Sequence, residues 1–88
     1  MKTTFRSSFL RDLKAVRDKQ LVARLRQAIE QVENAQSLSS LPQVKQLKGG
    51  RNHYRIRIGE YRVALTVEGE TATFVRFLHR KEIYIYFP

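Results

Sequence analysis

Residues 53–67 constrain the fold of this chain most, because apolar side chains occupy every second position in two consecutive runs. The apolar positions are Tyr54, Ile56 and Ile58 in the first run and Tyr61, Val63, Leu65 and Val67 in the second. A period of two is typical of a β-strand with one buried face. Only Gly59 and Glu60 separate the runs, and a two-residue loop with glycine first favours a type II′ turn. The segment therefore predicts an antiparallel hairpin.

The predicted turn also fixes the register of this hairpin. The expected facing pairs are Ile58 with Tyr61, Arg57 with Arg62, Ile56 with Val63, and Arg55 with Ala64. One face is then apolar, whereas the other brings like charges together, which destabilises a sheet. Either these arginines extend into water, where salt screens their repulsion, or they form a cradle for a phosphate group. In the second case, removal of Arg62 is expected to abolish activity without lowering stability.

The N-terminal half shows helical periodicity after a short predicted strand over residues 2–6. Ser7 or Ser8 is a candidate N-cap for a first helix, and Asp18 is the candidate N-cap for a second helix that ends near Asn34. The apolar stripes comprise Phe9, Leu10, Leu13 and Val16 in the first helix, and Leu21, Val22, Leu25, Ala28, Ile29 and Val32 in the second. We expect a helical hairpin that packs on the sheet.

The hairpin that follows has two possible registers. A two-residue Gly-Glu loop would direct Phe74 and Arg76 toward the core. A three-residue loop, 68–70, would exchange the two faces and direct a different set inward: Thr73, Val75 and Phe77. We favour the longer loop, because it keeps Arg76 out of the core and directs Leu78 and Arg80 toward the arginine-bearing face.

Two further segments complete the predicted fold. Residues 35–46 lose the helical pattern and predict a loop with apolar side chains tucked under it, whereas residues 83–88 alternate or run apolar and are expected to extend a strand. The order is then β-α-α-β-β-β. We predict an α+β (α/β) protein, in which a small antiparallel sheet packs on a two-helix hairpin, with a single domain over residues 1–88.

Charge is the most informative part of the composition. The 88 residues include 17 Lys and Arg against 8 Asp and Glu, a formal net charge of +9. Such an excess favours a polyanion, an acidic partner protein or an anionic membrane surface. Cysteine is absent, which excludes disulfides and thiolate metal sites. The N-terminal residues lack the apolar region of a signal peptide and no apolar run suits a membrane span, so we expect a cytoplasmic protein.

Two segments resemble the signature stretches of the RelE/ParE toxin superfamily. They are residues 54–63, YRIRIGEYRV, and residues 79–84, HRKEIY; the Leu47-Lys48-Gly49 segment also resembles the sequence that leads into that family's hairpin. The resemblance covers the whole chain and implies a RelE-like fold and a toxin of a toxin–antitoxin pair. It also implies an acidic antitoxin protein as partner. RelE-branch toxins are endoribonucleases that cut mRNA on the ribosome, whereas ParE-branch toxins poison DNA gyrase.

Residue matches to the family's site favour the nuclease branch. They are the basic pair on the first hairpin strand, the arginine that opens the second, the His-Arg pair after the last strand and the downstream tyrosine: Arg55, Arg57, Arg62, His79, Arg80 and Tyr84. This chain departs from the RelE prototype, which has lysines where Arg55 and Arg57 stand. Because arginine keeps its proton near neutral pH, neither can serve as a general base, so His79 and Tyr84 are the two candidates.

The implied chemistry is RNA cleavage through attack of a 2′-hydroxyl on the adjacent phosphate, without a metal or a small-molecule cofactor. Arginines stabilise the developing negative charge, and a second group moves the proton. Further contacts with RNA or the ribosome are expected from five residues: Lys48, Arg51, His53, Arg76 and Lys81. The alternatives are a ParE-like gyrase poison and a non-catalytic, basic nucleic-acid-binding module.

Overall fold

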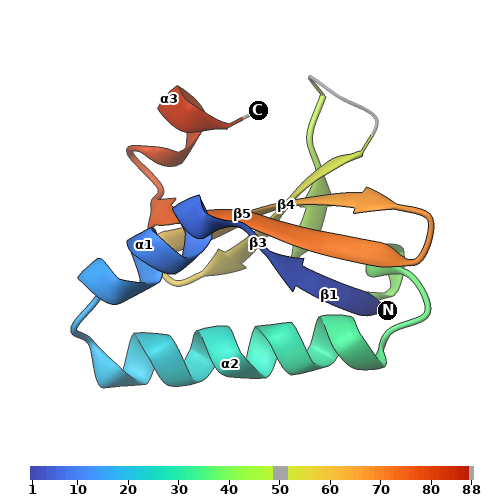
Figure 1. The fold of residues 1–88 in the computed structure, drawn as a ribbon, viewed down its shortest axis with the longest axis horizontal. Coiled ribbons are helices and arrows are strands. Elements are labelled where there is room, and N and C mark those ends of the chain that lie inside the picture. The colour runs from blue at the N-terminus through green and yellow to red at the C-terminus, as the bar shows by residue number, and fades with distance from the viewer. Residues whose placement is uncertain (49–51, 88) are drawn as a thin grey trace.

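The computed structural model describes residues 1–48 and 52–87, and at its centre is a five-stranded sheet with the order β1-β5-β4-β3-β2. The strands are β1 (Lys2–Phe5), β2 (Val44–Gln46), β3 (His53–Ile58), β4 (Tyr61–Glu68) and β5 (Thr71–His79). The helices are α1 (Ser7–Ala15), α2 (Lys19–Asn34), the 3₁₀ helix η1 (Leu38–Ser40) and α3 (Ile83–Tyr86). The edge strand β1 runs parallel to β5, and the other pairs are antiparallel. Figure 1 shows α2 along one face of the sheet and α3 over the other.

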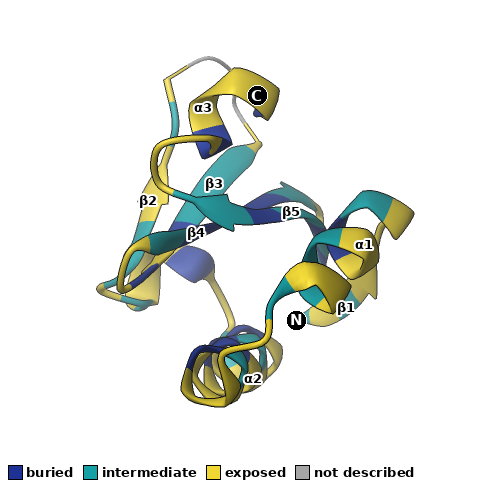
Figure 2. Ribbon diagram, turned by 90° about the vertical axis from the view of Figure 1, so that its left-hand side faces the viewer, coloured by how far each residue is buried: buried dark blue, intermediate teal, exposed yellow. Residues whose placement is uncertain are grey.

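The main core lies between the helical hairpin and the sheet, as the two apolar stripes predicted. Its largest fully buried side chains are Phe9, Leu25, Val32, Ile56, Val63, Leu65, Phe74 and Phe77. Figure 2 shows the buried side of α2 turned toward the strands. Asp18 caps α2 as expected, since its Oδ1 accepts hydrogen bonds from the main-chain N–H groups of Gln20 and Leu21 at 3.0 and 3.2 Å. Leu10, by contrast, is 45% exposed.

The predicted serine cap of α1 is wrong. Ser7 lies inside the helix, and the N-cap position is Arg6, whose side chain makes no capping hydrogen bond. Ser8 is used differently, because its hydroxyl donates to the main-chain carbonyl of Val75 at 2.6 Å. This contact lies beyond the point where β1 stops pairing with β5, so α1 takes over the cover of that open strand edge.

The predicted register of the β3–β4 hairpin is confirmed. Ile58 faces Tyr61 and Arg57 faces Arg62, with the remaining pairs following in step. Gly59 has φ of +58°, as the first position of a type II′ turn requires. An added Cβ there would lie 3.0 Å from Nη1 of Arg24 on α2, so glycine is needed for both conformation and space.

The predicted register of the β4–β5 hairpin is wrong near its turn and correct near its end. The loop has two residues, so Ala72 and Phe74 lie on the core side. A bulge next to Ala64 and Leu65 then shifts the register, and an extra residue in one strand exchanges the faces. Beyond it Phe77 returns to the core. Neither of the two continuous registers considered from the sequence contains this shift.

The C-terminal residues form a helix rather than the predicted strand. Ile83 and Phe87 are buried, and they pack in a second small apolar cluster on the sheet face opposite to α2, with Ala64, Leu47, Val75 and Leu78. A strand would have left this apolar patch uncovered, which explains why the helix forms. The predicted 35–46 loop also contains structure, namely η1 and the short edge strand β2. Leu38 is buried beneath it as expected.

Candidate active site

The arginine-bearing face of the sheet brings together side chains from β3, β4, the end of β5 and α3. The electrostatics of Arg62 identify the group. Burial lowers the pKa of Arg62 most, Arg55 and Arg57 lower it further by charge repulsion, Arg80 adds a smaller effect, and Tyr84 acts in the opposite direction. Of the six predicted catalytic residues, the structure therefore gathers five around one point: Arg55, Arg57, Arg62, Arg80 and Tyr84.

Arg62 is the buried member of this arginine cluster. It is only 8% exposed, and its Nη1 donates to the main-chain carbonyls of Gly59 and Tyr61, each at 2.8 Å. Sequence reasoning treated Arg62 as one half of a repulsive pair. The structure shows that it also supports the hairpin turn, because its guanidinium binds a main-chain carbonyl on each side of Glu60.

Replacement of Arg62 by alanine is therefore expected to lower stability, contrary to the expectation from the sequence. The variant loses two charge-assisted hydrogen bonds, and relief of the repulsion between arginines offsets part of that loss. We expect the free energy of unfolding to fall by about 1–2 kcal/mol, which corresponds to a fall in Tm of about 5–10 °C. Thermal unfolding followed by circular dichroism measures it. Arg57→Ala is the control, because Arg57 is exposed. An unchanged Tm for Arg62→Ala would show that the turn does not depend on it.

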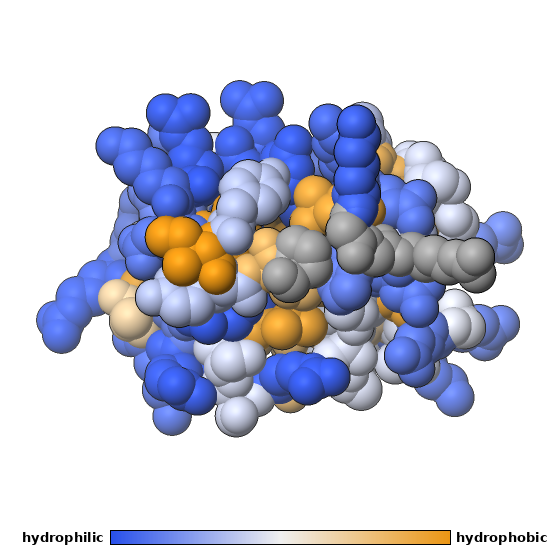
Figure 3. Space-filling model, turned by 90° about the horizontal axis from the view of Figure 1, so that it is seen from above, coloured by the Kyte–Doolittle hydropathy of each residue, from blue (hydrophilic) through white to orange (hydrophobic). Residues whose placement is uncertain are grey.

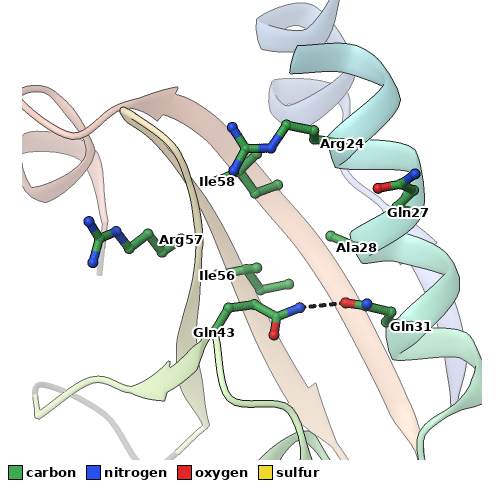
Figure 4. A pocket seen from close by; sticks show the side chains of 8 residues that line it. All are labelled: Arg24, Gln27, Ala28, Gln31, Gln43, Ile56, Arg57 and Ile58. Carbon is green, nitrogen blue, oxygen red and sulfur yellow. Dashed lines mark hydrogen bonds between the residues drawn. The ribbon is translucent and has the colours of Figure 1, made fainter. Parts of the chain in front are cut away.

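Arg55 and Arg57 present the accessible charges of the cluster. Figure 4 shows Arg57 directed away from α2, whereas its strand neighbours Ile56 and Ile58 point toward that helix. Among the described residues, the buried Nε of Arg55 has no hydrogen-bond partner. Both arginines line a surface groove of about 460 Å³ beside β2, together with Pro42, Gln43, Val44 and Lys45. This groove can hold an anionic chain next to the arginine cluster.

Arg80 stands just beyond β5 and is held by the β3–β4 turn. Its Nε contacts a carboxylate oxygen of Glu60 at 2.7 Å, and its main-chain N–H donates to the carbonyl of Glu60 at 2.8 Å. The pairing uses Nε, so the Nη1 and Nη2 donors of Arg80 are not occupied by Glu60. They can bind phosphate oxygens as a fork.

Tyr84 reaches the cluster because α3 folds back over this face. The helix is anchored by Ile83 and Phe87, while Tyr84, Ile85 and Tyr86 are exposed. Seen from the α3 side, strongly hydrophilic residues surround a smaller group of hydrophobic ones (Figure 3). A phenol at this position can stack on a base or exchange a proton with a substrate held by the arginines.

His79, the sixth predicted catalytic residue, is not placed with the other five. In the β4–β5 ladder it faces Tyr61, which packs on the helix side of the sheet, and the two rings meet edge to face at 5.7 Å. Its Nδ1 accepts a hydrogen bond from the N–H of Lys81 at 3.1 Å. The imidazole therefore shapes the turn that carries Arg80.

Arg76 is engaged within the protein rather than available for RNA. Its guanidinium makes two hydrogen bonds to the carboxylate of Asp12 on α1, at 2.7 and 3.0 Å. The hydrogen bond with Asp12 raises the pKa of Arg76 despite partial burial. The guanidinium also lies over the ring of Tyr86, 4.8 Å from its centroid. Arg76 thus connects α1, β5 and α3.

The other predicted contact residues are dispersed. Lys48 and Lys81 are exposed, whereas His53 is half-buried and packs edge to face on Phe87 at 5.0 Å. Arg51 lies outside the described residues. Across residues 1–48 and 52–87, no group of His, Asp and Glu side chains is arranged to hold a metal ion. No helix in those residues is long and apolar enough to cross a membrane.

Sequence reasoning missed two residues that matter to the site. Asp12 was given no role, although it binds both Arg76 and the main-chain N–H of Phe77, the latter at 3.0 Å. Glu60 was taken only as a turn residue. The one available signal was its position, since it is the sole acidic residue between Arg51 and Val67.

Comparisons with known proteins place this geometry in a family. The family model for the ParE toxin of type II toxin-antitoxin system, parDE, matches residues 4–84. Toxin RelE3 of Methanocaldococcus jannaschii is 45% identical over 89 residues, covering 100% of both chains. A solved RelB-RelE antitoxin-toxin complex from Methanococcus jannaschii matches with a TM-score of 0.81 and 42% identity, over 97% of this chain and 99% of that one. An archaeal RelE-RelB complex from Pyrococcus horikoshii has a TM-score of 0.74 over 93% and 97% of the two chains, with 19% identity, and supports the fold alone.

Proposed function

Since this chain belongs to the RelE/ParE superfamily and is a RelE-family toxin of a type II toxin–antitoxin system, we propose that it is a ribosome-dependent endoribonuclease that cuts mRNA. One observation carries the proposal. Arg55, Arg57, Arg80 and Tyr84 all act electrostatically on the buried Arg62, beside a groove whose lining includes Lys45, Arg55 and Arg57. The four arginines come from three segments: β3, β4 and the residues after β5. Charges that approach from several directions suit a phosphate, which carries negative charge on several oxygens.

The proposed reaction is metal-independent. The 2′-hydroxyl of a ribose loses its proton and attacks the adjacent phosphate, while the 5′-oxygen of the next nucleotide leaves with a proton. Arg57 and Arg80 offer accessible guanidinium donors to the phosphate oxygens, and the buried Arg62 adds fixed positive charge behind them. Such preorganised donors stabilise the charge that develops in the transition state.

Tyr84 is the better-placed of the two candidate proton carriers. It acts on Arg62, whereas His79 faces Tyr61 and accepts from Lys81. Tyr84→Phe is expected to lower the single-turnover cleavage rate by about 10²-fold, within the usual range of proton-transfer effects. His79→Asn keeps an acceptor close to the position of Nδ1 and is expected to lose less than about 10-fold. Rates on mRNA-programmed ribosomes decide between them, and a larger loss for His79→Asn would reverse the assignment.

A cell-free translation system tests the proposed activity directly. Purified toxin is added to translating ribosomes, and the reporter mRNA is examined for cuts by primer extension. We expect cleavage in the coding region on ribosomes and little or none on the free transcript. Intact mRNA on ribosomes that translate in the presence of excess toxin would refute the nuclease function.

A gyrase poison is the second candidate, because the family model that matches residues 4–84 is that of the ParE toxin. Supercoiling of relaxed plasmid by gyrase, with and without the toxin, tests it. The residues of the arginine cluster argue for RNA instead, since a gyrase-binding surface has no need of a tyrosine beside four arginines. A non-catalytic nucleic-acid-binding module would show neither activity.

The proposed partners follow from charge and from the relatives. The relative of known structure at 42% identity is bound to a RelB antitoxin, and this chain carries a formal net charge of +9. We expect an acidic antitoxin that covers the arginine cluster or displaces α3, whose Tyr84, Ile85 and Tyr86 are exposed. Residues 1–88 would act as a single domain in the cytoplasm, where ribosomes and mRNA are found. Relief of growth inhibition by the adjacent reading frame would support this partner.

A further inference from the structure

The turn between β3 and β4 meets the end of β5 through one residue pair, Glu60 and Arg80. The main-chain N–H of Arg80 donates to the carbonyl of Glu60 at 2.8 Å, and Arg80 Nε contacts the Glu60 carboxylate at 2.7 Å. The same residue therefore fixes both the backbone from which the Arg80 side chain starts and the guanidinium at its tip.

The neighbours of Glu60 in this turn hold a second arginine. Nη1 of Arg62 donates to the carbonyls of Gly59 and Tyr61, which flank Glu60 on either side. The turn thus contacts two arginines of the cluster that come from different segments, Arg62 from β4 and Arg80 from beyond β5. Its geometry sets their relative positions.

Stability is a weak reason for a carboxylate at this position. The side chains of Glu60 and Arg80 are 66% and 55% exposed, and exposed ion pairs contribute little to folding. A negative charge beside the arginine cluster also repels an anionic substrate. The Glu60 carboxylate therefore adds little stability and opposes substrate binding. Its presence is explained if it orients Arg80, the arginine that it contacts.

We propose that Glu60 is a positioning residue, which holds the guanidinium of Arg80 in the orientation that binds phosphate. The inference rests on the proposed function of the arginine cluster. Because the contact uses Nε, the paired Nη donors stay open on the opposite edge of the guanidinium plane. The side chain is then ordered before the substrate arrives, and less of its freedom is lost in the transition state.

Glu60→Gln is expected to lower kcat for cleavage of ribosome-bound mRNA by about 10-fold. KM should stay the same or fall, because a charge that repels the substrate has been removed. In an Arg80→Ala background, Glu60→Gln should cause no further loss, since Glu60 acts through Arg80. Glu60→Asp keeps the carboxylate and should restore part of the rate. Equal fractional losses with and without Arg80 would overturn the proposal.

Glu70→Gln is the matched control. Glu70 is the second residue of the other Gly-Glu turn, between β4 and β5, so the substitution makes the same change in charge in the same kind of turn. It is expected to leave kcat unchanged. A 10-fold loss in this variant too would show that net charge, rather than the contact with Arg80, determines the rate.

A measurement on the free protein keeps this inference separate from the nuclease function. ¹⁵N relaxation of the Arg80 Nε–Hε group reports its order on the picosecond to nanosecond timescale. We expect an ordered group in the wild type and in Glu70→Gln, and a mobile one in Glu60→Gln. Equal order in all three proteins would refute positioning by Glu60. Failure of the wild type to cut mRNA would instead refute the proposed function, and the relaxation data would still decide the role of Glu60.

Discussion

Arg57→Ala is expected to reduce the single-turnover rate of mRNA cleavage by about 10²–10³-fold, the usual effect of removing one donor that stabilises transition-state charge. Arg57 is exposed and faces the buried Arg62 across the β3–β4 hairpin. It therefore presents its guanidinium where the fixed charge of Arg62 adds to it. The Tm should change little, because surface substitutions of this kind usually fall within about 0.5 kcal/mol.

Two further variants separate geometry from charge at this position. Arg57→Lys keeps the charge but loses the planar fork, so we expect a loss of about 10-fold. Arg17→Ala removes an equal charge from the exposed connection between α1 and α2, and it should leave the rate nearly unchanged. If Arg17→Ala and Arg57→Ala had equal effects, general electrostatic attraction would explain the activity and the arginine cluster would not be an active site.

The same variants test the non-catalytic alternative. A simple binding module loses affinity and function together when a contact is removed. An enzyme that loses transition-state stabilisation keeps its affinity for the ribosome while its rate falls. Sedimentation of each variant with ribosomes, measured alongside cleavage, distinguishes these cases. For Arg57→Ala we expect nearly normal sedimentation and a much lower rate.

The β3–β4 hairpin could be predicted in full because two independent signals agree. The alternation of apolar and charged residues sets the faces, and the Gly59-Glu60 turn sets the register. From these alone, Arg55, Arg57 and Arg62 were placed on one face. Burial of Arg62 was not predictable in this way, since its guanidinium is held by contacts with two main-chain carbonyls of the turn.

The β4–β5 hairpin shows why a single register can mislead. Both loop lengths considered from the sequence assumed an unbroken ladder, and the bulge next to Ala64 and Leu65 makes each of them correct for half of β5. The bulge serves both faces. It lets Phe74 and Phe77 both reach the core although their odd spacing does not fit one strand face, and it sends Arg76 to the α3 side.

The C-terminal helix was missed because alternation in residues 83–87 imitates a strand. The deciding factor is tertiary, since Ile83 and Phe87, four residues apart, cover apolar side chains that the bulge exposes on the arginine-bearing face. His79 entered the predicted site through the resemblance, which pairs it with Arg80. Adjacent residues at a strand end point to opposite faces, and in the structure the His79 ring packs on Tyr61, on the face opposite to the arginine cluster.

The last and largest effect on stability is expected at Asp12. Its side chain is 9% exposed and binds Arg76, itself 23% exposed, and it also accepts from the main-chain N–H of Phe77. Asp12→Ala leaves a partly buried guanidinium without its carboxylate and a strand N–H without an acceptor. We expect a loss of about 3 kcal/mol, the lower end of the range for breaking a buried pair.

Two variants divide this loss into its parts. Asp12→Asn keeps an oxygen for the N–H of Phe77 and removes the charge, so an intermediate loss is expected. Asp18→Ala removes only the N-cap of α2, which typically costs about 1 kcal/mol. Urea unfolding of the three variants measures these values. A loss at Asp12 no larger than that at Asp18 would mean that the Arg76 pair adds nothing beyond an ordinary hydrogen bond.

The pH dependence of this loss follows from Arg76. The hydrogen bond with Asp12 raises the pKa of Arg76 in the folded state, so its stabilisation is present below the unfolded pKa and is lost only as pH rises through the folded one. Both pKa values lie well above neutrality, and the free-energy penalty of Asp12→Ala should be the same at about pH 7 and pH 9.

Arg76 also contacts Tyr86 on α3, so a more mobile Arg76 side chain should make α3 more mobile. Asp12→Asn, measured where it remains folded, should then lower cleavage through Tyr84, and unchanged cleavage would show that α3 is held by Ile83 and Phe87 alone.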